Sequence, residues 1–489
     1  MTRQQERKQE EKRIRQEKKE AKRGNAQILL LTYSITIIFL ALIIFFSYFM
    51  VTKSQKIINN PYNKRQEVME KKVIRGSIKS SDGKVLAKTE TDKNGQDIRV
   101  YPYDKVFCHV VGRLTNSMTG LEKEYCYPLL TSHANPVSQL LDTFKGQKSP
   151  GDHLITTLDA ELQETAYEAL GNYKGAIVAM EPSTGKILAM VSKPAYNPNK
   201  IEQNWEELVQ ASSANSKLIN RATQGLYPPG STFKILTAIE YIRENPDTYE
   251  EYRYQCKGTD SFSGNVINCY DKEQHGTLDL KEAFAKSCNG AFAEIGTKID
   301  ADKLHALAES FRFNQNLPVD FEYNQSKFNL TGSSDMGELT QTVIGQGKTL
   351  ITPLENAMIV STIANNGVMM KPYVVDHLEN ADGEIQEELE PKELGKVIEP
   401  WVAQKMTQYM KAVVNKGTGT ALKGMSMSVA GKTGSAEFDS QGTSHAWFVG
   451  FAPASNPDIV VSIVVEGAGT GSQYAVPIAQ KMLKCYFNE

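Results

Sequence analysis

The chain has 489 residues, of which 40% are hydrophobic and 23% charged, and its formal net charge is −2. This composition predicts a globular protein of mixed helix and strand content with one membrane span. The sequence has no internal repeats, and its near-neutral charge excludes the strongly basic balance that is typical of nucleic-acid-binding proteins.

Residues 1–27 are a charged tail, and residues 28–51 are the predicted membrane span. The tail holds ten Lys or Arg and five Glu, which is typical of a solvated or lipid-contacting segment. The next 24 residues carry no charge, and a helix of this length crosses a hydrocarbon core of about 30 Å. Ser47–Met50 offers no small-residue cleavage site, so we expect an uncleaved anchor. Because the tail is more positive than the residues after the span, we expect a single-pass cell-membrane protein with a cytoplasmic N-terminus and an extracellular remainder.

The exterior part divides near residue 155. Residues 52–155 are polar with short apolar runs, which predicts a strand-rich N-terminal domain. Residues 156–489 have stronger patterns, beginning with an amphipathic helix over 158–170 and continuing with strong strand and helix patterns from Gly175. We therefore expect a tail, a membrane anchor, a small domain and one large domain, in that order.

The sequence Tyr-Pro-Pro-Gly-Ser-Thr-Phe-Lys at 227–234 places a Ser-x-x-Lys motif at a predicted helix start. The residues before the serine cannot propagate a helix from upstream, and serine is favoured at a helix N-terminus. Three residues are nearly one helical turn, so Lys234 lies on the same face as Ser231 and can accept its proton. A lysine acts as a base only where burial or a second cation lowers its pKa, and Lys432 is a candidate for that cation. Taken alone, the motif would describe a helix start with a surface lysine.

Ser287-Cys288-Asn289 ends an amphipathic stretch that begins at Leu278. Ser287 can carry a proton between Lys234 and a leaving amine, and Asn289 can hold a substrate amide or the lysine. The same residues also fit a helix C-terminus capped by Asn-Gly, and the two interpretations are compatible.

A Lys-Thr-Gly motif at 432–434 lies on a predicted strand rich in small residues, which let a substrate backbone approach closely. Lys432 and the Thr433 hydroxyl are suited to bind a free carboxylate, whereas an isolated Lys-Thr-Gly would be an exposed edge strand. The predicted antiparallel strands of this region cover residues 428–437, 447–451 and 458–466.

The chain contains six cysteines and seven histidines. There is no Cys-x-x-Cys and no zinc-like Cys/His spacing, so we expect no metal site. Cys256 and Cys269 bracket a Gly/Ser/Asn-rich loop outside the membrane, where a disulfide is allowed but not required. The other cysteines are expected to be ordinary small apolar residues, at positions Cys108, Cys126, Cys288 and Cys485. His445 either lines a cleft or has a structural role.

The three motifs follow one another at separations of 56 and 145 residues, in the order found in serine enzymes that attack D-alanyl-D-alanine ends or β-lactams. On these residues the chain resembles the class B penicillin-binding proteins, which are monofunctional peptidoglycan D,D-transpeptidases, and in particular the short-pedestal kind of Gram-positive bacteria. Further segments that carry the resemblance are Arg75–Ile78, Asp82–Gly83, Leu86–Ala87, Gly120–Glu122, Gly175–Ser192, Ile344–Gly347, Thr352–Leu354, Ala364–Gly367 and Gly417–Thr420.

The resemblance implies an α/β (α+β) fold. Its parts are a penicillin-binding, serine β-lactamase-like domain with a central antiparallel sheet flanked by helices, a strand-rich pedestal and one transmembrane helix. It implies an oxyanion hole formed by the backbone amides of Ser231 and Ser435. The implied catalytic residues are Ser231, Lys234, Ser287 and Asn289, and the implied substrate-binding residues are Lys432, Thr433, Gly434 and Ser435. Cys288 stands where the family often has serine.

The implied activity is the cross-linking of stem peptides through a Ser231 acyl-enzyme that penicillin also forms. The expected partners are stem peptides ending in D-Ala-D-Ala, β-lactams and a SEDS-family glycan polymerase, with no cofactor. Only 179 residues separate Val51 from Ser231, which leaves no room for a glycosyltransferase domain. The open alternatives are a membrane-anchored β-lactamase or D,D-carboxypeptidase of the same fold, and a catalytically silent β-lactam sensor or cell-wall scaffold.

Overall fold

The computed structural model describes residues 3–52, 64–212, 215–438 and 443–489. The chain falls into two units, Met1–Asn63 and Lys64–Glu489, and each is described by itself.

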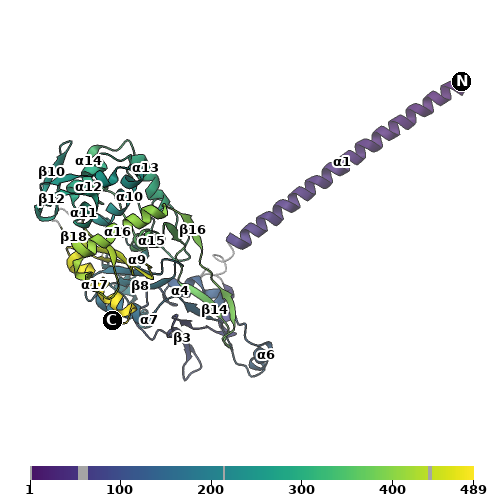
Figure 1. Ribbon diagram of the computed structural model, residues 1–489. Helices are drawn as coiled ribbons and strands as arrows, with labels where there is room; N and C mark the ends of the chain where they lie inside the picture. Colours follow the sequence, from purple (N-terminus) through teal and green to yellow (C-terminus); the bar gives the residue numbers. More distant parts are fainter. Residues whose placement is uncertain (1–2, 53–63, 213–214, 439–442) are drawn as a thin grey trace. The chain divides into compact units, whose positions relative to one another are not determined.

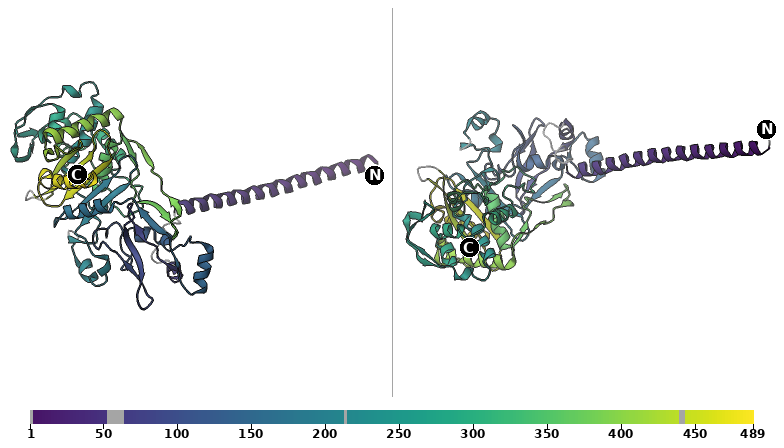
Figure 2. Two further views of the ribbon diagram at one scale, coloured as in Figure 1. Left: turned by 60° about the horizontal axis from the view of Figure 1, so that its bottom comes forward. Right: turned by 90° about the horizontal axis from the view of Figure 1, so that it is seen from above.

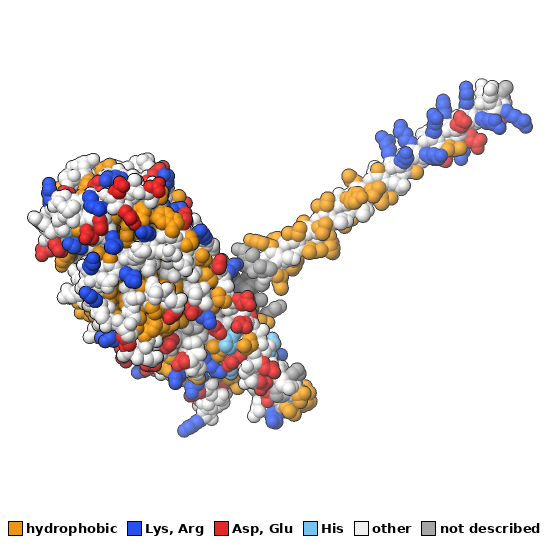
Figure 3. Space-filling model, viewed as in Figure 1, with side chains coloured by type: hydrophobic (Ala, Val, Ile, Leu, Met, Phe, Trp, Pro, Cys, Tyr) orange, Lys and Arg blue, Asp and Glu red, His pale blue; other side chains and the backbone are white. Residues whose placement is uncertain are grey.

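The first unit contains one long helix, α1 (Arg3–Thr52). It is the one helix in the described part of the chain that is long and apolar enough to cross a membrane. Figure 3 shows Lys and Arg side chains toward its N-terminal end and hydrophobic side chains along the remainder. The predicted tail and the predicted span therefore share one helix, because the Glu, Lys, Arg and Gln of the tail are good helix formers.

The second unit begins with a six-stranded sheet in the order β15-β14-β6-β2-β3-β4. Leu154 on β6 pairs with Ile78 on β2 and with Leu378 on β14. Two strands from late in the chain, β14 and β15, thus complete a sheet that starts near residue 78. This hairpin crosses the domain boundary predicted near residue 155, and that boundary stays a prediction. The elements are α3 (Lys64–Glu70), β1 (Val73–Ile74), β2 (Ile78–Lys79), β3 (Val85–Thr91), β4 (Asp97–Val100), α4 (Gly120–Glu124), α5 (Cys126–Leu129), α6 (Pro136–Phe144), β5 (Ser149–Pro150), β6 (His153–Thr156), β14 (Val375–Glu379) and β15 (Ile385–Glu388).

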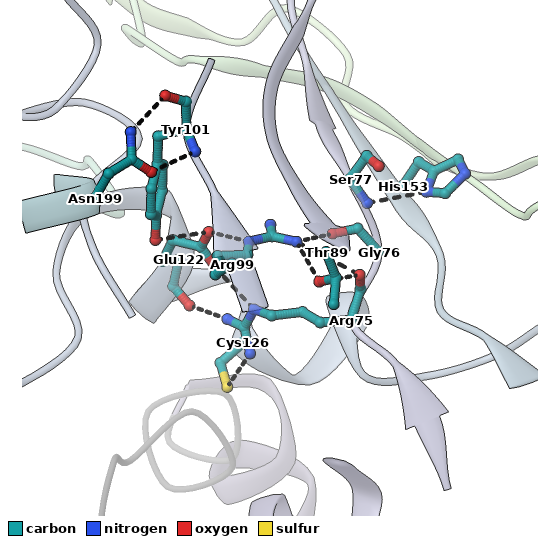
Figure 4. A network of polar contacts seen from close by, with 10 residues as sticks. All are labelled: Arg75, Gly76, Ser77, Thr89, Arg99, Tyr101, Glu122, Cys126, His153 and Asn199. Atoms are coloured by element: carbon teal, nitrogen blue, oxygen red, sulfur yellow. Dashed lines mark hydrogen bonds and ion pairs between the residues drawn. The ribbon is translucent and has the colours of Figure 1, made fainter. Parts of the chain in front are cut away.

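A buried ion cluster ties this region together (Figure 4). The Nε atoms of Arg75 and Arg99 donate to the two carboxylate oxygens of Glu122, at 2.8 and 2.7 Å. Burial alone would lower the pKa of Arg75 and raise that of Glu122, but the opposite charges reverse both shifts. The segments at 75–78 and 120–122 that carry the family resemblance meet in this cluster.

The core of the unit is a five-stranded antiparallel sheet in the order β17-β18-β19-β7-β8. Its strands are buried on both faces, since Ile177 packs with the residues of α7 and α17 whereas its neighbour Val178 packs with those of α15. Figure 1 shows α7 and α17 side by side. The expected antiparallel sheet flanked by helices is confirmed. Its elements are α7 (Ala160–Ala169), β7 (Gly175–Met180), β8 (Ile187–Lys193), α15 (Pro353–Ala364), β17 (Ala430–Glu437), β18 (Ser444–Ala452), β19 (Ile459–Val465) and α17 (Gly471–Tyr486).

A mainly helical region lies at the end of the unit away from residues 64–156, as Figure 1 and the left view of Figure 2 show. Its central helix, α10, is buried from Lys234 to Ile242. The remaining elements of the unit are η1 (Pro198–Lys200), α8 (Trp205–Gln210), α9 (Arg221–Gln224), η3 (Gly230–Thr232), α10 (Lys234–Glu244), η4 (Tyr249–Glu251), β9 (Tyr254–Cys256), β10 (Thr259–Phe262), β11 (Asn265–Asn268), η5 (Tyr270–Lys272), β12 (Gly276–Leu278), α11 (Leu280–Ala285), α12 (Asn289–Gly296), α13 (Ala301–Ser310), α14 (Met336–Thr342), β13 (Val368–Met370), β16 (Glu393–Lys396), α16 (Pro400–Lys416) and η6 (Thr420–Leu422).

Candidate active site

Ser231 lies on η3, a single 3₁₀ turn directly before α10. The preceding Gly230 has φ +53°, and a Cβ atom there would stand 2.7 Å from the carbonyl oxygen of Ser435 on β17. The Gly230 amide donates to the carbonyl oxygen of Gly345 at 2.9 Å. Only glycine adopts this conformation at so close an approach, so the turn that presents Ser231 packs directly on the Lys-Thr-Gly strand and on the 344–347 segment.

Lys234 is fully buried and joins the first motif to the second. Its Nζ donates to the Ser287 carbonyl oxygen at 2.7 Å, to Ser287 Oγ at 3.3 Å and to Asn289 Oδ1 at 2.6 Å. An ammonium has three donors, and these acceptors use all of them. Within the described chain Lys234 accordingly makes no hydrogen bond to Ser231, although we expected one. Catalytic hydrogen bonds are often long in the absence of substrate.

Lys432 on β17 reaches the same hydroxyl group from the other side. Its Nζ donates to Ser287 Oγ at 2.8 Å and to the Thr433 carbonyl oxygen at 3.0 Å. Ser287 Oγ therefore lies between two lysine amines, one from each of the other motifs. The three motifs, far apart in the sequence, converge on this oxygen atom.

The two amines are buried without compensating charge. Neither Lys234 nor Lys432 has an ion-pair partner among the described residues, and both side chains are 0% exposed. Burial lowers the pKa of Lys234 to about 8. Burial and the charge of Lys234 together hold the pKa of Lys432 well below its ordinary value. We expected Lys432 to act on Lys234, but burial causes the Lys234 shift. Such a pair holds one proton more readily than two, so one amine is neutral near neutral pH.

Ser287 occupies a short break between two helices. Helix α11 ends at Ala285, Ser287 takes a left-handed φ of +56°, and Asn289 begins α12. The expected Asn-Gly C-cap is therefore wrong, because the left-handed residue is Ser287 itself and the Asn-Gly pair opens the next helix. Asn289 Nδ2 also donates to the carbonyl oxygen of Asn268 at 2.8 Å. The break turns the carbonyl and hydroxyl groups of Ser287 toward the lysines.

An open cleft of about 860 Å³ lies over these groups. Ser231, Asn289 and Ser435 line it, whereas the two lysine side chains are buried behind them. His445 satisfies both expectations, since it lines the cleft and its Nδ1 accepts the Gly467 amide at 3.2 Å. Sequence reasoning missed further lining residues that come from β11, from α14 and from the loop after it, namely Val266, Ile267, Asn268, Gln341 and Gln346.

The Lys-Thr-Gly strand is held in place by side chains that no motif identified. The Thr433 hydroxyl is hydrogen-bonded to the hydroxyl of Thr418, which belongs to the Gly417–Thr420 segment. Trp447 Nε1 on the neighbouring strand donates to the Pro228 carbonyl oxygen at 3.0 Å. Gly434 packs against the Pro229 carbonyl oxygen. These contacts fix β17 against the turn that carries Ser231.

Comparisons with known proteins agree with this geometry. A family model described as the penicillin binding protein transpeptidase domain matches residues 175–484. The peptidoglycan D,D-transpeptidase PbpA of Mycolicibacterium smegmatis is 34% identical over 462 residues, covering 88% of this chain and 92% of that protein. The crystal structure of penicillin-binding protein A from Mycobacterium tuberculosis as a ceftriaxone acyl-enzyme complex is 31% identical, with a TM-score of 0.77, and the match covers 86% of this chain and 99% of that one. A D,D-transpeptidase domain from Eggerthella lenta is 33% identical, with a TM-score of 0.76 and coverage of 85% and 98%.

Proposed function

The chain belongs to the class B penicillin-binding proteins and is a peptidoglycan D,D-transpeptidase, and we propose that Ser231 is the nucleophile of its reaction. The observation that carries this proposal is the pair of buried, uncompensated amines of Lys234 and Lys432, which meet at Ser287 Oγ beside the cleft that Ser231 and Asn289 line. A neutral amine in this place is a base that the serine otherwise lacks.

In the first step, the Ser231 hydroxyl oxygen attacks the carbonyl carbon of the penultimate D-alanine of a stem peptide, and its proton passes to neutral Lys234. A neutral Lys234 amine has only two N–H donors, so one of its three hydrogen bonds is lost and its lone pair can face the Ser231 hydroxyl. The negative charge on the carbonyl oxygen falls between the backbone amides of Ser231 and Ser435. Each such donor lowers the barrier by about 3–4 kcal/mol.

In the second step, the tetrahedral intermediate collapses and the bond to the terminal D-alanine breaks. The leaving amine takes a proton that Ser287 Oγ relays, since this oxygen accepts from Lys432 at 2.8 Å and from Lys234 at 3.3 Å. The Lys432 amine and the Thr433 hydroxyl donate hydrogen bonds to the terminal carboxylate. Asn289 Oδ1 accepts a hydrogen bond from Lys234 and thereby holds the lysine amine close to Ser287.

The acyl-enzyme is then attacked by an amine of a neighbouring stem peptide, which restores the Ser231 hydroxyl and forms a 4→3 cross-link. Penicillins acylate the same oxygen atom of Ser231, and the resulting ester is hydrolysed slowly. Among the described residues that line the cleft, Glu437 is the one carboxylate, and it is exposed to solvent at the end of β17. A β-lactamase or carboxypeptidase needs a base that activates water at the ester, and a solvated carboxylate is a poor candidate for it.

Labelling with a fluorescent penicillin tests the nucleophile. The full-length wild-type protein should be labelled, and Ser231→Ala should not. Ser333→Ala is a matched control, because Ser333 is exposed in a loop away from the cleft, and it should be labelled like the wild type. Equal labelling of wild type and Ser231→Ala would refute the assignment.

Product analysis separates the transfer reaction from hydrolysis. A stem-peptide substrate with an amine acceptor should give the cross-linked peptide as the main product. Free acid as the main product in the presence of acceptor would indicate a carboxypeptidase, and rapid release of hydrolysed penicillin would indicate a β-lactamase. Release of D-alanine that survives Ser231→Ala would contradict both the mechanism and these alternatives.

The membrane arrangement and the partner also belong to this proposal. Residues 1–27 lie in the cytoplasm, residues 28–51 span the membrane, and a pedestal (52–155) and a transpeptidase domain (156–489) face the outside. The charge of the tail and the apolar stretch of α1 support this orientation. The family resemblance supports a SEDS-family glycan polymerase as partner. Protease treatment of intact protoplasts should digest the part after residue 52 and spare the tail, and the reverse pattern would contradict this topology.

A further inference from the structure

Three cysteines and one histidine gather beside the active site, although no sequence spacing predicted it. They are Cys256, Cys269, His275 and Cys288, and their ligand atoms all lie within 4.8 Å of one another. Cys256 ends β9, Cys269 follows β11, His275 precedes β12, and Cys288 is the middle residue of the second motif. Figure 1 shows β10, β12, α11 and α12 together at this end of the unit.

The separations match a tetrahedral metal site. The sulfur atom of Cys269 lies 3.7 Å from that of Cys256 and 3.7 Å from that of Cys288, and Cys256 Sγ lies 3.4 Å from His275 Nδ1. Zn–S bonds of about 2.3 Å and a Zn–N bond of about 2.0 Å put tetrahedral sulfur atoms about 3.8 Å apart and the nitrogen about 3.5 Å from each sulfur. The three separations above agree with these values, and the other three are no longer than 4.8 Å.

The surroundings of the histidine also suit a metal ligand. His275 Nδ1 faces the sulfur atoms, while its Nε2 lies 3.6 Å from the carboxylate of Glu273. Histidine ligands commonly direct their second nitrogen to a carboxylate, which fixes the ring and strengthens the ligand. The His275 side chain is only 5% exposed, and the three cysteines are buried, so the four ligand atoms form a closed set with no position left for substrate.

We propose that Cys256, Cys269, His275 and Cys288 bind a structural zinc ion that fixes the second motif of the active site. Three thiolates and one imidazole form a donor set that favours zinc over hard cations. The three thiols of this cluster cannot all pair with one another, because a disulfide between any two leaves the third free. This proposal departs from the sequence expectation of no metal site, because the fold brings the ligands together from separate segments.

The segment that contains the ligands needs a cross-link of this kind. Strands β9 to β12 form two separate two-stranded sheets, and isolated two-stranded sheets are marginally stable in water. Between them, Asp271 and Lys272 both take left-handed φ values, of 50° and 53°, which persist only where surrounding contacts impose them. A metal ion joined to all parts of the segment supplies that constraint.

The position of Cys288 connects the metal to the chemistry. Its neighbours Ser287 and Asn289 hold Lys234, and Asn289 also bonds to Asn268, which directly precedes the ligand Cys269. Strand β11, which ends at Asn268, lines the cleft that contains Ser231. The zinc ion thus acts as a positioning element for the relay and for one cleft wall, without touching the substrate.

Metal analysis tests the site itself. The full-length protein, purified in detergent without added metal, should contain about one zinc ion per chain. Cys269→Ser and His275→Ala should reduce the zinc content to near zero. Cys485→Ser is the matched control and should keep its zinc, because Cys485 lies on α17 and accepts from Thr165 at 3.3 Å. A wild-type protein that holds no zinc and carries a Cys256–Cys269 disulfide would overturn the proposal.

A second measurement covers the case in which the variants do not fold. A thiol reagent applied to the native wild-type protein should modify the three ligand cysteines only after a chelator has removed the metal. Adding zinc or cobalt(II) back should protect them, and cobalt should give the absorption of a tetrahedral thiolate complex. Equal modification with and without the chelator would contradict the site.

The positioning role rests on the proposed function, and its test is separate. Removal of zinc should slow acylation by penicillin about tenfold, and zinc should restore it. An unchanged acylation rate would overturn the positioning role. The zinc content of the purified protein would still show whether the metal site exists. Labelling of Ser231→Ala would refute the proposed nucleophile instead, and it has no bearing on the zinc content.

Discussion

Two regions of this protein bury charged side chains, and they do so in opposite ways. In residues 75–122, part of the proposed pedestal, Arg75 and Arg99 enclose Glu122, and each charge has an opposite charge within 2.8 Å. Behind the cleft, Lys234 and Lys432 meet at a neutral hydroxyl, without an ion-pair partner in the described chain. In the first region the charged forms are stabilised, and in the second they are destabilised.

The presence or absence of a counter-charge distinguishes a structural cluster of buried charges from a catalytic one. A compensated buried cluster holds chain segments in one arrangement, because removal of one member leaves an unpaired charge in the interior. An uncompensated pair weakens the fold but creates an amine that accepts protons at neutral pH. Shifted pKa values that arise from burial without a counter-charge therefore point to the active site, whereas the shifts in the pedestal do not.

The largest expected effect is that of Lys234→Met, which replaces the amine by an apolar chain of similar length. Acylation by penicillin should fall about a thousandfold, the usual range for loss of a proton acceptor. The melting temperature should be unchanged or higher, because an uncompensated charge leaves the interior. Stopped-flow acylation and thermal unfolding of the full-length protein measure the two effects.

Lys348→Met is the control for this variant, since the Lys348 side chain is 74% exposed. It should leave acylation unchanged. A Lys234→Met protein that acylates normally would remove the distinction between the two regions.

For Glu122→Gln we expect a loss of stability without a loss of acylation, the opposite of Lys234→Met. Two buried guanidinium groups then lose their shared carboxylate, which should destabilise the fold by about 3–5 kcal/mol. Acylation per folded molecule should stay close to the wild-type rate, because Glu122 contacts no residue of the three motifs among its hydrogen bonds to Arg75, Arg99 and Tyr101. Denaturation and active-site titration check the two statements, and loss of acylation in folded protein would contradict the second.

The pH dependence of acylation should follow the lysine pair. Lys234 accepts the Ser231 proton only when it is neutral, so activity is lost as Lys234 becomes protonated at low pH. Because the pKa of Lys234 is lowered to about 8, the rate should rise about tenfold per pH unit below that value and level off above it. A rate that does not rise between about pH 6 and pH 8, measured with a β-lactam stable over the range, would contradict neutral Lys234 as the base.

The smallest effect is expected for an exposed ion pair, which sets the baseline for both regions. Lys123 and Glu322 lie 2.6 Å apart, and the Glu322 side chain is 58% exposed. Glu322→Gln should change the free energy of unfolding by no more than about 1 kcal/mol and should leave acylation unchanged. A loss as large as that of Glu122→Gln would show that burial is not what distinguishes the pedestal cluster.

The elements that local patterns define were predictable from the sequence. The strands β17 to β19 are short runs bounded by turn residues, and α10 follows a run that breaks helices, so both lie near their predicted positions. The motif residues were named in advance because their order and spacing resemble those of a known family. That resemblance, rather than periodicity, supplied their roles.

Contacts between distant segments that no motif marks were not predictable. Nothing near Leu154 indicates that Leu378 pairs with it, and nothing in the spacing of Cys256, His275 and Cys288 indicates a common site. The hydrogen-bond partners of Lys234 could not be predicted either. Its amine donates to Asn289 and Ser287 and not to Ser231. Such features depend on tertiary packing, which periodicity does not encode.

Mass spectrometry of the penicillin adduct tests the central claim most directly. The full-length protein is incubated with penicillin, digested, and the peptide that carries the adduct is sequenced. The account predicts a single adduct on Ser231 in the wild type, and a much slower formation of the same adduct in Lys234→Met. An adduct on Ser287 or on another residue, or an adduct on Ser231 that forms equally fast without Lys234, would contradict it.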